Sequence, residues 1–73
     1  MSYMLEIIPV NQGTVRPPSI TSERPTMHLA LVALLAWVEG EGDDFHIYPT
    51  KSKEAGIIKR YGNPRYHYFI WEM

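Results

Sequence analysis

An uninterrupted apolar run from Leu29 to Val38 sets the main constraint on how this chain can fold. The run is about half as long as the roughly 20 residues that a helix needs to cross a bilayer, so it predicts a core or interface helix. Thr26 can cap a helix that runs to Glu39, and Gly40 then stands where a left-handed C-terminal residue is needed. We therefore expect this helix to be the main element of the fold.

The predicted helix is apolar nearly all round. At about 100° per residue, one face collects a first set of side chains, namely Met27, Leu31, Leu34, Leu35 and Val38. The roughly opposite side collects Leu29, Val32, Ala33 and Ala36. A two-layer domain covers only one face of its helix, so this second side must be hidden by the proline-rich segment of residues 14–25, by self-association or by another protein.

The size of the chain limits it to a single domain, residues 1–73. A domain this small buries about 60% of the surface that its unfolded chain exposes. The hydrophobic share of 45% predicts a packed core, and the absence of cysteine excludes disulfides, thiolate zinc sites and cysteine nucleophiles. The first residues have no basic leader before an apolar stretch, so we expect no signal peptide and a cytoplasmic protein.

Three segments have the character of β-strands. Tyr3 to Val10 is rich in β-branched and aromatic residues and ends at turn-forming ones. The alternation from Phe45 to Tyr48 places Phe45 and Ile47 on one face. Tyr66 to Trp71 is a closing strand with aromatic residues on both faces. Together these segments predict an α+β fold, with one apolar helix packed on a small, mainly antiparallel sheet.

Residues 14–25 contain Pro17, Pro18 and Pro25 among several serines and threonines. This composition favours a flexible, polyproline-like arm over helix or sheet. So long a connector is often a binding loop in a compact domain. The alternative, which is about as well supported, is that the apolar residues of the arm simply lie over the helix.

Residues 52–61 leave two interpretations open. Ser52 can cap a short second helix, since apolar residues recur at every third position from Ala55 to Tyr61, although Gly56 weakens this interpretation. The alternative is a strand from Ile57 to Tyr61 that turns through residues 62–64 into the closing strand. The capping residue and the spacing favour the helix.

Charge is distributed unevenly, although the net charge is only −1. Residues 1–49 carry an excess of acid and the remainder an excess of base, a dipolar layout that suits a partner surface of both signs. A solvated surface with chance asymmetry explains this pattern about equally well.

Basic residues between Lys51 and Arg65 stand close to several tyrosines, an interleaving that can grip single-stranded nucleic acid by charge and stacking. The favoured structural interpretation places Tyr66, Tyr68 and Ile70 on one face of a sheet while Phe69 and Trp71 fill the core. The overall pI near 6.3 also argues against free nucleic acid as the main ligand.

No pattern for catalysis or for a bound metal or cofactor is found. The three histidines are widely spaced and share no paired-ligand motif. Asp43 and Asp44 are adjacent carboxylates in a glycine-rich turn, where solvation explains them better than acid–base chemistry does. We therefore expect neither an enzyme nor a small-molecule substrate, and no membrane partner.

The chain as a whole resembles a known family, and its opening from Ser2 to Val10 and its aromatic ending from Tyr68 to Met73 carry the likeness. It is similar to the small transcription regulators with which lytic phages of Xanthomonas act on host bacterial RNA polymerase. The resemblance implies binding to the N-terminal region of the β′ subunit, inhibition of promoter initiation through loss of σ, and antitermination at intrinsic terminators. It also implies the host cytoplasm, with a host Nus elongation factor and nascent RNA nearby.

The resemblance transfers no individual contact residue, so the candidate partner-binding residues come from the patterns above. They are Arg16, Ile20, Leu29, Val32, Lys51, Lys53, Lys59, Arg60, Arg65, Tyr66 and Tyr68. We expect docking through the arm or an exposed strand edge, with the basic segment Lys51 to Arg65 facing acids of the polymerase or emerging RNA. Two alternatives are a single-stranded RNA- or DNA-binding module and an inhibitor that occludes another host enzyme.

Overall fold

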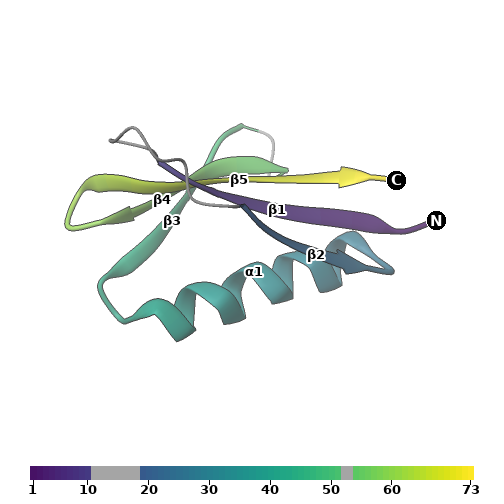
Figure 1. The fold of residues 1–73 in the computed structure, drawn as a ribbon, viewed down its shortest axis with the longest axis horizontal. Coiled ribbons are helices and arrows are strands. Elements are labelled where there is room, and N and C mark those ends of the chain that lie inside the picture. The colour runs from purple at the N-terminus through teal and green to yellow at the C-terminus, as the bar shows by residue number, and fades with distance from the viewer. Residues whose placement is uncertain (11–18, 52–53) are drawn as a thin grey trace.

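A computed structural model describes residues 1–10, 19–51 and 54–73. Its elements are β1 (Tyr3–Pro9), β2 (Ile20–Arg24), α1 (Met27–Glu41), β3 (Phe45–Pro49), β4 (Ala55–Arg60) and β5 (Asn63–Glu72). The strands form one antiparallel sheet in the order β2-β1-β5-β4-β3, and α1 lies along one face of it (Figure 1). The predicted α+β architecture is confirmed.

The helix begins as predicted and ends later. The Thr26 hydroxyl oxygen accepts a hydrogen bond from the Leu29 amide at 3.1 Å, which confirms the N-cap. Gly42 (φ 144°) follows the last helical residue, and its amide donates to the Val38 carbonyl. The assignment of Gly40 as the C-terminal residue was wrong, because Gly40 is still helical and Gly42 is the glycine that takes the positive φ. In the part of the chain that the structure describes, no helix has the length and apolar character of a membrane span.

The core lies between α1 and the sheet. Its buried members are Leu5, Ile7, Ala30, Leu34, Val38, Ile58, Tyr68 and Ile70. The buried side of α1 differs in part from the predicted face, since Leu35 is 54% exposed whereas Ala33 packs against the core. Trp37 extends the packing, with its ring meeting Tyr66 edge-on at a centroid distance of 4.8 Å.

The two faces of β5 are the reverse of the favoured prediction. Tyr68 and Ile70 are buried against the helix, at 1% and 3% exposure, while Phe69 and Trp71 are exposed on the other face. Pairing with β1 is the reason, because Tyr68 stands opposite Ile7 and Ile70 opposite Leu5, both of them core residues of β1. The placement of Phe69 and Trp71 in the core was therefore wrong.

The short second helix is also absent from the described part of its range, residues 54–61, where β4 pairs with both β3 and β5. The strand alternative is correct in kind, because Ile57 and Ile58 are β-branched and a hairpin fixes their register. Its bounds were wrong, since β4 runs from Ala55 to Arg60 and residues 63 and 64 already belong to β5. That hairpin turns at Tyr61 (φ 52°) and Gly62 (φ 78°), and positive φ at both central residues defines the two-residue turn that suits the twist of the strands. Ser52 lies outside the described residues.

The second half of the predicted arm is a strand. Residues Ile20–Arg24 pair with β1, with Ile20 opposite Ile7 and Ser22 opposite Leu5. The arm interpretation was wrong for this segment because the five residues between Ser19 and Pro25 contain no proline, so all of their amides can join a ladder. Residues 14–18 of the predicted arm, Arg16 among them, lie outside the described residues.

Candidate partner-binding surfaces

The face of the sheet turned away from α1 is not covered by any other described element (Figure 1). It carries large exposed aromatic side chains, namely Tyr48, Phe69 and Trp71, which we call the open-face aromatics. Strand register places Met4 opposite Trp71, and Ile57 opposite both His67 and Tyr48. An apolar and aromatic band therefore crosses the sheet from β1 to β3.

Charged groups of both signs border this band. The Lys59 ammonium lies 4.8 Å from the centroid of the Tyr48 ring, a cation–π contact on β3 and β4. At the other side of the sheet, Glu6 stands opposite Phe69 and Glu23 opposite Met4. The open face is thus basic toward β3 and acidic toward β2.

Arg60, the last residue of β4, forms an ion pair and lies near two aromatic rings. Arg60 Nε lies 2.7 Å from Asp44 Oδ2, and its guanidinium carbon lies 5.5 Å from the Phe45 ring centroid and 5.3 Å from that of Tyr61. The hydrogen bond from Arg60 lowers the pKa of Asp44, and the same bond raises the pKa of Arg60. Asp44 therefore already balances the charge of Arg60, and the pair ties the hairpin to the start of β3.

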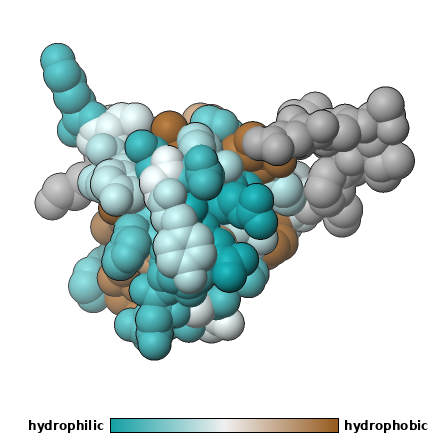
Figure 2. Space-filling view, turned by 90° about the vertical axis from the view of Figure 1, so that its left-hand side faces the viewer, coloured by the Kyte–Doolittle hydropathy of each residue, from teal (hydrophilic) through white to brown (hydrophobic). Residues whose placement is uncertain are grey.

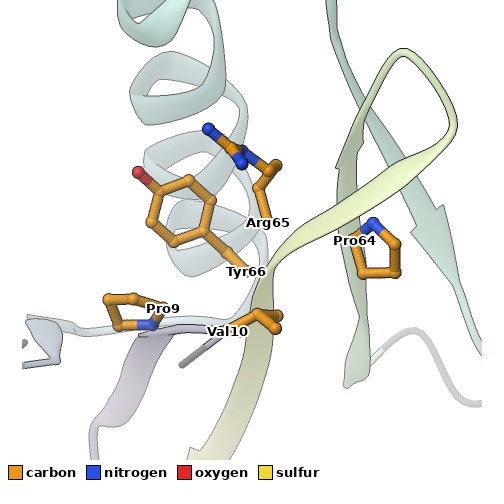
Figure 3. A pocket seen from close by; sticks show the side chains of 5 residues that line it. All are labelled: Pro9, Val10, Pro64, Arg65 and Tyr66. Carbon is orange, nitrogen blue, oxygen red and sulfur yellow. The ribbon is translucent and has the colours of Figure 1, made fainter. Parts of the chain in front are cut away.

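Arg65 and Tyr66 point to the same side of β5, toward α1 (Figure 3). Alternation breaks here because the pairing of β4 with β5 shifts between Ile58 and Lys59, leaving Arg65 as the extra residue of a bulge. Around them lies an open hollow of about 270 Å³, lined also by Pro9, Val10 and Pro64. Figure 2 looks onto this end of the molecule, where hydrophilic residues fill the centre of the view.

The outer side of α1 exposes apolar residues, as predicted for Leu29 and Val32. Their exposed fractions are 41% and 45%, and Leu35 adds a third large side chain to the helix surface. Burying such a side chain fully is worth about 1.5–3 kcal/mol relative to leaving it in water. Contact with another surface would therefore be favourable here.

The structure divides the predicted contact residues into separate groups. Lys59, Arg60 and Arg65 come together at the β4–β5 hairpin, and Lys51 is exposed after β3. Ile20 is exposed on β2, at the opposite edge of the sheet from β3. Lys53, like Arg16, lies outside the described residues.

The two tyrosines of the predicted contact set, Tyr66 and Tyr68, are buried to different extents. Tyr66 is half-buried against Trp37, with part of its ring in the hollow beside Arg65. Tyr68 is only 1% exposed, and burial raises the pKa of its hydroxyl. Tyr68 can therefore meet a partner only through the small part of its surface that lines an apolar groove between α1 and β3.

Sequence reasoning missed the open-face aromatics and Leu35. A signal for the former was present in β5, where His67, Phe69 and Trp71 share one face by alternation. A polar histidine in that set marks the face turned to solvent, whereas Tyr68 and Ile70 alternate with it. Leu35 lies at the border of the buried helix face, and only the position of β3 decides its exposure.

These surfaces are open and carry large exposed apolar side chains, which suits contact with another molecule. Within residues 1–10, 19–51 and 54–73, no polar or charged side chain is buried and no cluster of histidine and carboxylate groups could hold a metal ion. No protein-family model, curated protein or solved structure matches the chain.

Proposed function

We propose that this chain is a small phage regulator that binds the RNA polymerase of its bacterial host at the N-terminal region of the β′ subunit. In this proposal it inhibits promoter initiation by interfering with σ and promotes antitermination at intrinsic terminators. The identity of the partner comes from the resemblance of the whole sequence to such regulators. The surfaces of the domain support binding to a large protein as its mode of action.

One observation carries the proposal: large apolar side chains are exposed on both outer sides of the domain. Leu29, Val32 and Leu35 lie on α1, while Phe69 and Trp71 lie on the open face of the sheet. A domain this small is only marginally stable, because it buries a smaller fraction of its surface than a larger domain does. Exposed apolar patches commonly mark protein–protein contacts. This distribution favours a protein that completes its burial on a partner.

The charges suit a polymerase surface. Lys59 and Arg65 lie at one end of the molecule, on the hairpin side, and both signs of charge border the open face. Complementary charge speeds encounter and fixes the orientation of a docked protein more than it raises affinity. Basic groups near the RNA exit could contact acids of the polymerase or the emerging transcript.

The proposal is tested by mixing the purified chain with Xanthomonas RNA polymerase, as core enzyme and as σ-containing holoenzyme, and following co-elution on size exclusion. We expect co-elution with core, σ missing from the complex formed with holoenzyme, reduced promoter-dependent transcription and increased terminator readthrough. Failure to co-elute with either form would contradict the proposal. Co-elution without a change in initiation or termination would contradict the regulatory part alone.

A second candidate function is supported by the open-face aromatics. Exposed aromatic rings beside a lysine can stack single-stranded RNA or DNA bases, each stacked base contributing about 1–3 kcal/mol. Glu6 and Glu23 on the same sheet oppose this, because they would repel the phosphates. Tryptophan fluorescence during titration with a single-stranded oligonucleotide tests it, with Trp71→Ala as the matched variant.

Saturable quenching that Trp71→Ala removes, at physiological salt and without any protein partner, would favour the nucleic-acid function. Absence of both oligonucleotide binding and polymerase binding would leave an inhibitor that occludes another host enzyme.

A further inference from the structure

An apolar groove runs between α1 and the edge strand β3. It has a volume of about 360 Å³, and its lining is entirely apolar or aromatic: Leu31, Leu34, Leu35, Ile47, Pro49 and Tyr68. Leu35 stands at its rim with 54% of its surface exposed, while Tyr68 and Leu34 form a buried floor. The groove is large enough for a bulky aliphatic side chain of a ligand and offers it no polar partner.

The outer edge of β3 adjoins this groove and has free hydrogen-bonding groups. The Thr50 amide donates to the Ala55 carbonyl at 3.0 Å, so by alternation Tyr48 and His46 also direct their amides and carbonyls toward β4. Ile47 then directs both groups away from the sheet. Within β3, which the structure describes in full, Phe45 donates instead to Gly42 and Pro49 has no amide hydrogen, so Ile47 is the one free donor.

The turn that joins α1 to β3, beyond the residues that line the groove, is acidic. Glu39, Glu41 and Asp43 are exposed where α1 ends and turns into β3. The last turn of α1 has no basic residue, although the negative end of the helix dipole lies there. The neighbouring Asp44 is already paired with Arg60. This turn therefore carries negative charge that a basic ligand extending past the groove would compensate.

We propose that this groove and the free edge of β3 bind a short extended peptide segment of the partner protein. The segment pairs through its backbone with Ile47 and places an apolar side chain against Leu31 and Leu35. It carries lysine or arginine at the end that lies beside Glu41 and Asp43. An extended segment can form backbone hydrogen bonds with the free edge of β3. The apolar groove favours an apolar side chain on that segment, and the acidic turn favours a positive charge at its end.

The position of Pro49 limits the pairing to a short stretch, because a proline on an edge strand interrupts any longer ladder. The side chain in the groove must therefore contribute most of the affinity. The binding mode deepens the proposed function and rests on it only for the identity of the natural partner.

The first experiment needs no polymerase. The isotope-labelled chain is titrated in NMR with a short acetylated peptide in which a lysine pair precedes alternating valine, leucine and threonine, and with a matched peptide in which glutamates replace the lysines. We expect shifts at the Ile47 amide and at the methyl groups of Leu31 and Leu35, and affinity about tenfold weaker for the glutamate peptide. Equal affinity for the two peptides, shifts confined to other surfaces, or no shift at millimolar peptide would overturn the inference.

Two variants then distinguish peptide binding in the groove from peptide binding on the outer side of α1. Leu35→Lys places a charge at the groove rim, and Leu29→Lys makes the same change on the far side of α1, both at exposed positions that tolerate substitution. We expect Leu35→Lys to weaken lysine-peptide binding about tenfold or more and Leu29→Lys to leave it within about twofold. The reverse order would show that the outer side of α1 binds the peptide instead.

The second experiment uses the complex with RNA polymerase core. Hydrogen exchange of the Ile47 amide is measured in the free and the bound chain, with the outward-facing amides of Thr21 and Glu23 on β2 as internal controls. We expect Ile47 to exchange about tenfold more slowly when bound and the β2 amides to be unchanged. A complex in which Ile47 remains unprotected overturns the groove inference while leaving polymerase binding intact. Peptide binding without polymerase binding keeps the groove and removes the proposed partner.

Discussion

Replacing Gly56 by alanine is expected to destabilise the protein, because the structure leaves no room for a methyl group at this position. A Cβ on Gly56 would lie 2.5 Å from Tyr68 Cε2, 2.7 Å from the Tyr68 hydroxyl oxygen and 2.7 Å from the Tyr48 carbonyl oxygen. Tyr68 is buried in the core and the Tyr48 atom belongs to the backbone. Neither neighbour can move aside without disturbing the sheet or the packing under α1.

The expected magnitude follows from two opposing effects. Overpacking a core typically costs about 1–3 kcal/mol, and replacing glycine by alanine returns about 0.4–1 kcal/mol by restricting the unfolded chain. The net loss is therefore about 1–2 kcal/mol, and each kcal/mol lowers Tm by about 4–8 °C in a domain of this size. If residues 52–61 were helical, the same substitution would stabilise the protein by up to about 1 kcal/mol. The sign of the change thus separates the strand from the helix.

Urea unfolding followed by circular dichroism measures the effect. Gly40→Ala is the matched control, because this glycine lies within α1 and an added Cβ would meet nothing within 4 Å outside the helix's own backbone. This substitution should raise the free energy of unfolding by about 0.5–1 kcal/mol. In a Tyr68→Leu background, Gly56→Ala should cost less, because the ring atoms that it meets are gone. A Gly56→Ala protein as stable as the wild type, with the same dependence on urea, would refute the placement of Tyr68 against β4.

Three further predictions concern the ion pair, the hairpin charge and the helix cap. Arg60 holds the pKa of Asp44 below its ordinary value of 3.8 in the folded state, so the pair stabilises the protein above that value and the stabilisation is lost as the pH falls through the folded pKa. Asp44→Asn should therefore destabilise the protein at about pH 7 and have little effect near pH 2, and equal losses in urea unfolding at both pH values would contradict this. Lys59→Glu should weaken polymerase binding more at low salt than at high salt. Arg24→Glu, a charge reversal on the edge strand β2 at the other side of the sheet, should have little effect. A titration in which salt makes no difference would count against a role for Lys59. Thr26→Ala should cost about 1 kcal/mol in thermal or urea unfolding because it removes the bond to the Leu29 amide, and an unchanged midpoint would argue against that cap.

Local signals were sufficient for the elements that depend on nearby residues. Thr26 and the apolar run from Leu29 to Val38 predicted α1, and β-branched and aromatic residues predicted β1 and β3. Gly40 was predicted as the C-terminal residue of α1, whereas the structure has Gly42 there, because either glycine could end the helix. Such a choice depends on the turn into β3, which the helix sequence does not contain.

The errors occurred where distant pairing decides the outcome. The spacing from Ala55 to Tyr61 fits a helix as well as a strand, and only the ladders to β3 and β5 select the strand. Ile20–Arg24 became β2 because β1 offered it a free edge, despite the prolines on either side. The closing strand has aromatics on both faces, so its buried face depends on which side α1 covers.

The same distinction applies to the candidate binding surfaces: features set by nearby residues could be predicted, and features set by packing could not. The exposure of Leu29 and Val32 could be predicted from the helix wheel, and the grouping of Lys59 with Arg65 from their closeness in sequence. The groove between α1 and β3 could not be predicted, because its walls come from two elements whose separation is set by packing. The burial of Tyr68 likewise depends on its pairing with Ile7.

Binding of the chain to RNA polymerase is measured by biolayer interferometry, with immobilised core enzyme and with increasing free σ as competitor. We expect saturable binding in the submicromolar range that σ reduces, because the two ligands would have overlapping or antagonistic sites. Binding that σ leaves unchanged would contradict interference with σ. No binding at micromolar concentrations of the chain would contradict the polymerase assignment itself.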